Sequence, residues 1–230
     1  MAQLKNRFFG EMTGSFGDVV YRRRNGKNYT AKKPKSYAVP MDGKFQMRTA
    51  KFRLALKLAA VINSIPLIKT IWQQSLPKGA TPYQKLVSLN YPLLGFNDVA
   101  GILELVPKGG FGARIDTSLL SNESLSVALL PLTAASMINP AVEVSIMLIS
   151  LIFAKNPSLE GINAYEVLPV FSPVQPIDLV AQLSFTSLLS TADTDTLAQY
   201  QEKKIYNTLI TFDASNNPVQ YAKTFMSGAA

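Results

Sequence analysis

Between residues 44 and 64, apolar side chains recur largely at helical spacing, while lysines and arginines occupy other positions on the helical wheel. This pattern predicts an amphipathic helix. A proline then interrupts the pattern, and a second helical piece that contains the single tryptophan is expected over residues 67 to 74. The pair Thr81-Pro82 is typical of an N-cap followed by proline at the first helical position, so a third short helix should run towards Asn90.

Beyond Pro92 the pattern changes to short β-prone runs separated by Pro, Gly, Asn and Asp. The longest apolar run, from Val142 to Ala154, contains Glu143 and is too short for a membrane-spanning helix, so we expect a long buried strand there. Runs of this kind at such spacing favour an antiparallel β-sandwich-like domain. The runs are Val99 to Val106, Leu125 to Leu130, Val142 to Phe153, Tyr165 to Phe171, Leu179 to Phe185, Lys204 to Phe212 and Val219 to Phe225.

The clearest local signal lies near the N-terminus, where Asn25-Gly26 separates two β-prone runs, residues 18 to 24 and 27 to 33. Asn-Gly is the favoured pair for a two-residue type I′ turn, because both turn residues need positive φ. A basic β-hairpin is therefore predicted. Two strands alone are marginal in water, so the hairpin should pack on the body, pair with a neighbouring subunit or lie on an acidic ligand.

These patterns together predict an α+β protein with three parts. Residues 1–43 form a basic hairpin arm and linker, residues 44–92 a helical section, and residues 93–230 an all-β domain. The chain of 230 residues is long enough to bury one sizeable core or two small ones.

Charge is concentrated in the arm and the first helix. The first 57 residues hold fourteen Lys and Arg against Glu11, Asp18 and Asp42, whereas the rest of the chain holds nine basic and twelve acidic residues. Such asymmetry is typical of an interaction tail, although a solvated hairpin with incidental charge remains an alternative. The candidate contacts to nucleic acid or to a neighbouring subunit are Tyr21, Arg22, Arg23, Arg24, Lys27, Tyr29, Lys32, Lys33 and Lys35.

The composition removes much of the usual chemistry of enzymes. The chain has no Cys and no His, and therefore lacks thiolate nucleophiles, zinc-thiolate sites and the commonest general base. Asp193 and Asp195 could wrap a calcium ion, but their segment lacks the later glycine and glutamate of an EF-hand and is interpreted as a polar loop. The glycine cluster that begins at Gly109 is interpreted as a turn. We expect no enzymatic activity, no cofactor and no metal.

A family resemblance accompanies these patterns. Gly10, Gly14 and Gly17, the Val19-Val20 strand, the basic hairpin, Pro34 and a helix start of the form Gln46-x-Arg48-x3-Phe52 resemble a family of uncharacterised Bacteroidota proteins of about this length. The resemblance extends to the helical stretch, to Asn90-Tyr91 and to the end of the β-rich half. It implies the same architecture and a bacterium of that phylum, or its phage, as the source, and it implies no activity, cofactor or catalytic residue.

Three function classes follow. The preferred one is a structural protein that packs with copies of itself and with other assembly proteins, as a capsid or capsid-associated component of a phage virion, its basic arm contacting neighbours or nucleic acid. The second is a cellular, sequence-nonspecific nucleic-acid-binding protein, and the third a carbohydrate- or surface-binding β-sandwich module. No signal peptide is recognised near the N-terminus and no membrane span is expected, so the virion or the cytoplasm is the expected location.

Overall fold

The computed structural model of the protein describes residues 2–3, 14–24, 27–33, 42–132 and 137–228. It divides the chain into two compact units, Met1–Asp42 and Gly43–Ala230. Both units contain antiparallel sheets, and the second also contains helices, so the protein has an α+β fold. We call the first unit the N-terminal sheet and the second the body.

The N-terminal sheet has four antiparallel strands in the order β1-β4-β3-β2. Its two longest strands pair from Val19 opposite Lys32 to Arg24 opposite Lys27, as the sequence predicts, while the turn residues Asn25 and Gly26 lie outside the described residues. None of the residues of this sheet whose exposure is described is buried. The strands are β1 (Ala2–Gln3), β2 (Gly14–Phe16), β3 (Val19–Arg24) and β4 (Lys27–Lys32).

The body begins with three helices, and they confirm the three predicted helices to within two residues. They are α1 (Gly43–Ser64), α2 (Pro66–Ser75) and α3 (Pro82–Asn90). The 3-10 helix η1 (Tyr91–Leu93) follows α3. The chain turns by 99° between α1 and α2, because Ile65 is extended and Pro66 begins the new helix. The Thr81 side chain accepts a hydrogen bond from the backbone N–H of Gln84, as an N-cap does.

The body contains two antiparallel sheets. The larger has six strands, β7 (Ser145–Pro157), β8 (Tyr165–Phe171), β9 (Gln175–Pro176), β11 (Tyr200–Phe212), β12 (Pro218–Tyr221) and β13 (Phe225–Gly228). The smaller has the order β10-β6-β5, with β5 (Ile115–Leu120), β6 (Ser124–Leu129) and β10 (Leu183–Leu188). A short helix, α4 (Thr191–Ala198), precedes β11.

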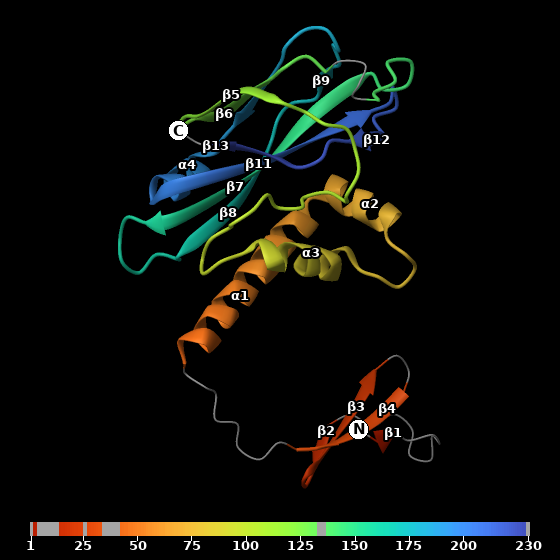
Figure 1. The fold of residues 1–230 in the computed structure, drawn as a ribbon, viewed down its shortest axis with the longest axis vertical. Helices are drawn as coiled ribbons and strands as arrows, with labels where there is room; N and C mark the ends of the chain where they lie inside the picture. Colours follow the sequence, from red (N-terminus) through yellow and green to blue (C-terminus); the bar gives the residue numbers. More distant parts are fainter. Residues whose placement is uncertain (1, 4–13, 25–26, 34–41, 133–136, 229–230) are drawn as a thin grey trace. The chain divides into compact units, whose positions relative to one another are not determined.

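The larger sheet is buried on both faces. Along β7, Ile149 and Leu151 pack with the helices, whereas Leu148 and Ile152 pack with the smaller sheet. A strand covered on both faces is apolar at nearly every position, which explains the long apolar run in the sequence. Figure 1 shows α1, α2 and α3 on one side of the larger sheet and β5 and β6 on the other. Helices and strands thus share one core across the predicted boundary at residue 92.

Four local predictions need correction. The run Val99 to Val106 is not a strand. Apart from the bridge between Leu94 and Val99 it has no strand pairing, and side chains such as that of Thr224 form hydrogen bonds with its backbone.

The run 219–225 is two strands, β12 and β13. The predicted loop at Asp193 and Asp195 is helix α4, whose capping box joins Ser190 to Asp193. Strand β10 starts at residue 183 rather than 179.

Candidate functional site

The register of β3 and β4 determines which predicted contact residues share a face of the N-terminal sheet. Arg22 lies directly opposite Tyr29, so these two side chains share one face. Tyr21 lies opposite Thr30, on the other face. The predicted contact residues therefore do not form one surface, because they are divided between the two faces of the sheet.

The remaining cations of the predicted set lie along the same two strands or beyond them. Lys32 lies opposite Val19, and Lys33 follows β4 with its backbone N–H bonded to Asp18. Arg24 and Lys27 are paired in register at the end of the hairpin. Lys35 lies outside the described residues. Arg22, Arg23, Lys32 and Lys33 are exposed, and Tyr21 and Tyr29 are partly exposed.

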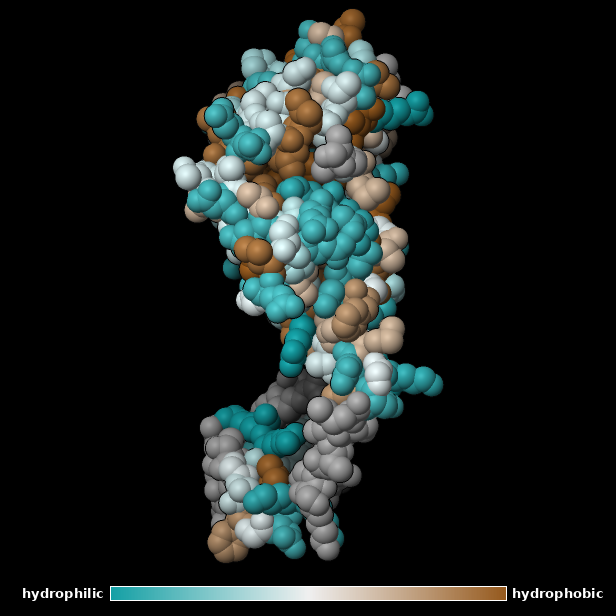
Figure 2. Space-filling model, turned by 90° about the vertical axis from the view of Figure 1, so that its left-hand side faces the viewer, coloured by the Kyte–Doolittle hydropathy of each residue, from teal (hydrophilic) through white to brown (hydrophobic). Residues whose placement is uncertain are grey.

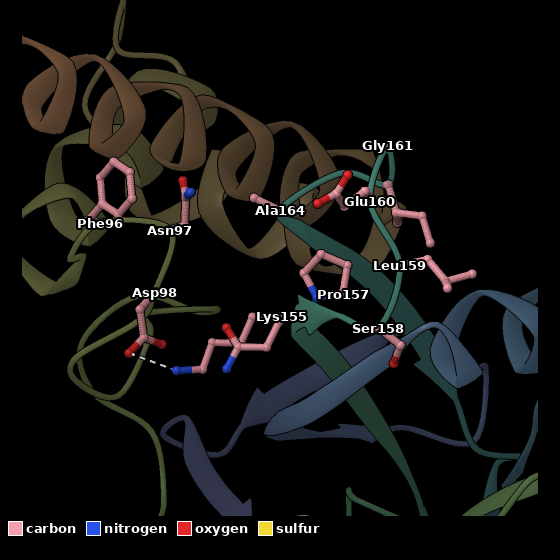
Figure 3. Close-up of a pocket in the computed structure, with 12 residues that line it drawn as sticks. Phe96, Asn97, Asp98, Lys155, Pro157, Ser158, Leu159, Glu160, Gly161 and Ala164 are labelled. Carbon is pink, nitrogen blue, oxygen red and sulfur yellow. Dashed lines mark ion pairs between the residues drawn. The ribbon is translucent and has the colours of Figure 1, made fainter.

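A different site, which sequence reasoning missed, lies on the body. An open groove of about 670 Å³ separates the loop of Phe96, Asn97 and Asp98 from the connection between β7 and β8. Figure 3 shows Lys155 and Asp98 facing each other across it, with Phe96 at one end. Asn97 and Asn156 at its rim have positive φ, a conformation that asparagine adopts more readily than most residues. We call this the loop groove.

An ion-pair network connects this groove to the larger sheet. The Lys155 Nζ lies 3.2 Å from Asp98 Oδ2 and 3.0 Å from Glu202 Oε2, and the Lys204 Nζ lies 2.8 Å from Asp98 Oδ1. Lys204 also donates to the backbone oxygen of Val99 at 2.6 Å. Asp98 is therefore held by one lysine from β7 and one from β11, and the network anchors the loop that carries it.

The electrostatics of the network favour anchoring over proton transfer. Burial alone would raise the pKa of Asp98, but hydrogen bonds from Lys204 and Lys155 outweigh it and lower that pKa. Burial alone would lower the pKa of Lys155, but hydrogen bonds to Glu202 and Asp98 outweigh it and raise that pKa. Both groups thus move away from neutrality, whereas a general acid or base needs a pKa near the working pH.

The part of the chain that the structure describes contains no group of three or more His, Cys, Asp or Glu side chains that could hold a metal ion. No single helix there is both long and apolar enough to cross a membrane, and only the bent pair α1 and α2 passes such a test together.

Comparisons with protein-family models, with curated proteins and with solved structures find no match to this chain.

Proposed function

We propose that the protein is a non-enzymatic structural subunit of a repeated homo-oligomeric assembly, of the kind that builds or decorates a phage virion. The exposure of the N-terminal sheet carries this proposal, because none of its residues with described exposure is buried. A small sheet with no apolar face covered is marginal in water. We infer that contacts with neighbouring molecules stabilise it in the functional state.

The strands at the edges of the N-terminal sheet offer one way to make such contacts. The sheet is flanked by β1 and β2, which have two and three residues. A strand from a neighbouring subunit could add to this sheet by antiparallel pairing.

The surface of the body supports the same proposal. Large apolar side chains are exposed at many positions, among them Ile102, Leu119, Val180 and Leu188. Figure 2 shows hydrophobic residues interspersed with hydrophilic ones on the face that it presents. Contacts between copies could bury side chains of this kind. The packing of the smaller sheet on the larger supports a sandwich-like description of this part of the body.

A second candidate function is sequence-nonspecific binding of nucleic acid through the N-terminal sheet. The position of Arg22 directly opposite Tyr29 favours it, because a cation beside an aromatic ring can contact a phosphate and stack on a base. The same pair could also contact a neighbouring subunit.

Mass photometry of the purified full chain at low and high salt, before and after nuclease treatment, tests the proposal. A large, defined oligomer that resists nuclease is the expected result, since contacts between copies do not need nucleic acid. A monomer that gains mass only with nucleic acid, and loses it in high salt, would contradict the proposal and favour the second candidate.

A charge-removal variant of β3 tests the role of the N-terminal sheet. Replacing Arg22, Arg23 and Arg24 by Ser should leave the circular dichroism and the melting temperature of the body unchanged while weakening assembly or nucleic-acid retention. The matched control removes three cations from the body, at Lys69, Lys78 and Lys85, and should assemble normally. Unchanged assembly and unchanged nucleic-acid retention in the β3 variant would show that the β3 arginines contribute to neither.

A further inference from the structure

Helix α1 carries an unusual distribution of charge. It contains five basic residues and no acidic residue. Three of the five, Lys44, Arg48 and Lys51, follow each other at spacings of four and three residues, which places them along one face. None of these three forms an ion pair with any described residue. By contrast, the Lys57 Nζ lies 2.6 Å from a carboxylate oxygen of Glu166.

The same three cations line a groove on the body. This groove of about 370 Å³ lies between α1 and the segment from η1 to Phe96. Tyr91, Leu94, Gly95 and Phe96 form the second wall. The Lys51 Nζ lies 4.8 Å from the centroid of the Tyr91 ring. One wall is therefore cationic and the other contains two aromatic rings, and we call this the helix groove.

Phe96 is the most accessible ring of the helix groove. Its side chain is 57% exposed, although it is large and apolar. It lines both the helix groove and the loop groove, and Figure 3 shows its ring on the loop close to the helices. The Gly95 backbone N–H donates to the Asp98 backbone oxygen at 2.8 Å, and Asp98 is held by Lys155 and Lys204. The aromatic wall is thus fixed to the larger sheet.

The charge balance of the chain indicates what kind of partner the helix groove would bind. Residues 43–230 hold fourteen basic and twelve acidic residues, so most of the chain's net charge of +8 comes from the first unit, and five of the basic residues of the body are gathered on α1. The carboxylates of the body are also partly committed, for example Asp98 and Glu202 to Lys155 and Glu166 to Lys57. The helix groove is thus complementary in charge to a different molecule with an excess of negative charge.

We propose that the helix groove binds single-stranded nucleic acid. Arg48 and Lys51 contact backbone phosphates, and an unstacked base lies on the exposed ring of Phe96. Cations that follow a backbone beside an aromatic ring are the combination used for single strands, whereas bases inside a duplex are not free to stack on a protein ring. An acidic peptide would satisfy the cations but leave the ring without a stacking partner. This inference does not depend on whether the chain assembles.

Fluorescence anisotropy with the full chain and a labelled oligothymidylate of about 20 nucleotides tests the phosphate contacts. The double variant Arg48→Ser/Lys51→Ser should lower the slope of log Kd against log salt by about 1.4, the change expected for two lost contacts to a single strand. The control Lys69→Ser/Lys85→Ser removes the same charge from exposed positions on α2 and α3 and should keep the wild-type slope. Equal slopes in the two variants would overturn the proposal.

A second pair of variants tests the base contact. Phe96→Ala should weaken binding by roughly 5- to 150-fold, as expected for one lost stacking interaction. Phe171→Ala removes another exposed ring, at the end of β8, and should bind as the wild type does. Unchanged affinity of Phe96→Ala, tighter binding to a duplex of the same length, or equally strong binding to polyglutamate would each overturn the assignment to single strands.

The N-terminal sheet could bind the same probe, so both pairs are repeated in the Arg22→Ser/Arg23→Ser/Arg24→Ser background. The groove variants should show the same changes in slope and affinity there, because none of the three arginines lines the helix groove. Loss of the groove effects in that background would assign the binding to the N-terminal sheet and overturn the proposal.

Discussion

The N-terminal sheet and the larger sheet of the body use the same antiparallel pairing but differ in burial. The strands β7 and β11 have thirteen residues each, and most of their side chains are buried, on both faces of the sheet. The strands β3 and β4 pair over six residues each, with no buried side chain among those described. Backbone hydrogen bonding is common to both pairs, so the two sheets differ in how much apolar surface they bury rather than in their pairing.

The two regions also treat charge differently. In the body, Lys155 and Lys204 share Asp98, and Lys57 is bonded to Glu166. Several charges of the body thus fix internal contacts between its strands, loops and helices. In the N-terminal sheet, strand β3 ends with three consecutive arginines, Arg22, Arg23 and Arg24.

The largest expected effect contrasts a buried with an exposed aromatic residue. Trp72 is 2% exposed and its indole N–H donates to the backbone oxygen of Leu105 at 2.9 Å, whereas Phe16 of β2 is 82% exposed. Trp72→Ala should lower the free energy of unfolding by about 3–5 kcal/mol. Phe16→Ala should change it by less than about 0.5 kcal/mol. Urea unfolding followed by circular dichroism measures the free energy of unfolding of both variants. Similar losses in the two variants would contradict the difference in burial between the regions.

A smaller effect separates two glycines that both have positive φ. A Cβ on Gly110 would lie only 2.2 Å from the backbone oxygen of Tyr221, whereas a Cβ on Gly17 would meet nothing within 4 Å. Gly110→Ala should therefore cost about 2–4 kcal/mol, since it adds a clash against backbone to the strain of the left-handed conformation. Gly17→Ala adds only that strain, about 1–2 kcal/mol, within the N-terminal sheet.

The melting temperature of the body reports the difference between the glycines. It should fall clearly for Gly110→Ala and stay unchanged for Gly17→Ala, because Gly17 belongs to the other compact unit. A body destabilised equally by both changes would show that the two units do not unfold independently.

Much of the fold could be predicted from local sequence signals. Pro66, Thr81 and Pro82 mark helix starts through backbone geometry that neighbouring residues set, and these helices are confirmed. The strand prediction for residues 99–106 was wrong for the opposite reason: most of the apolar residues of this segment are buried, but its backbone bonds to distant side chains rather than to a strand. Local apolar content predicts burial there and does not determine the pairing partner.

The candidate sites were harder to predict, because they depend on residues distant in sequence. Asp98 and Lys204 are 106 positions apart, and Phe96 reaches the basic face of α1 only after the chain has passed through α2 and α3. The basic set on β3 and β4 was visible in the sequence. The division of this set between two faces follows from the predicted two-residue turn, because that turn sets the register that places Arg22 with Tyr29 and Tyr21 on the other face.

The smallest expected effect concerns the ion-pair network that fixes the loop groove. The pKa of Asp98 is lowered from its ordinary value of 3.8, so its ionised form stabilises the folded state above that value. This contribution is lost as the pH falls through the lowered pKa. Asp98→Asn should reduce the free energy of unfolding at neutral pH by about 0.5–1 kcal/mol, a modest amount because the side chain is about one third exposed.

The pH dependence of the free energy of unfolding shows whether the ionised Asp98 carboxylate causes the difference between wild type and Asp98→Asn. The wild type should lose stability relative to Asp98→Asn as the pH falls below about 4, so that the two urea midpoints converge in acid. Asp195, an exposed carboxylate on α4, provides the matched control, and Asp195→Asn should not reproduce the convergence. Because the raised pKa of Lys155 keeps that lysine charged well above neutrality, the difference between wild type and Asp98→Asn should stay constant from pH 6 to pH 9. A difference that changes across that range would mean that a group other than this network determines the stability of the loop.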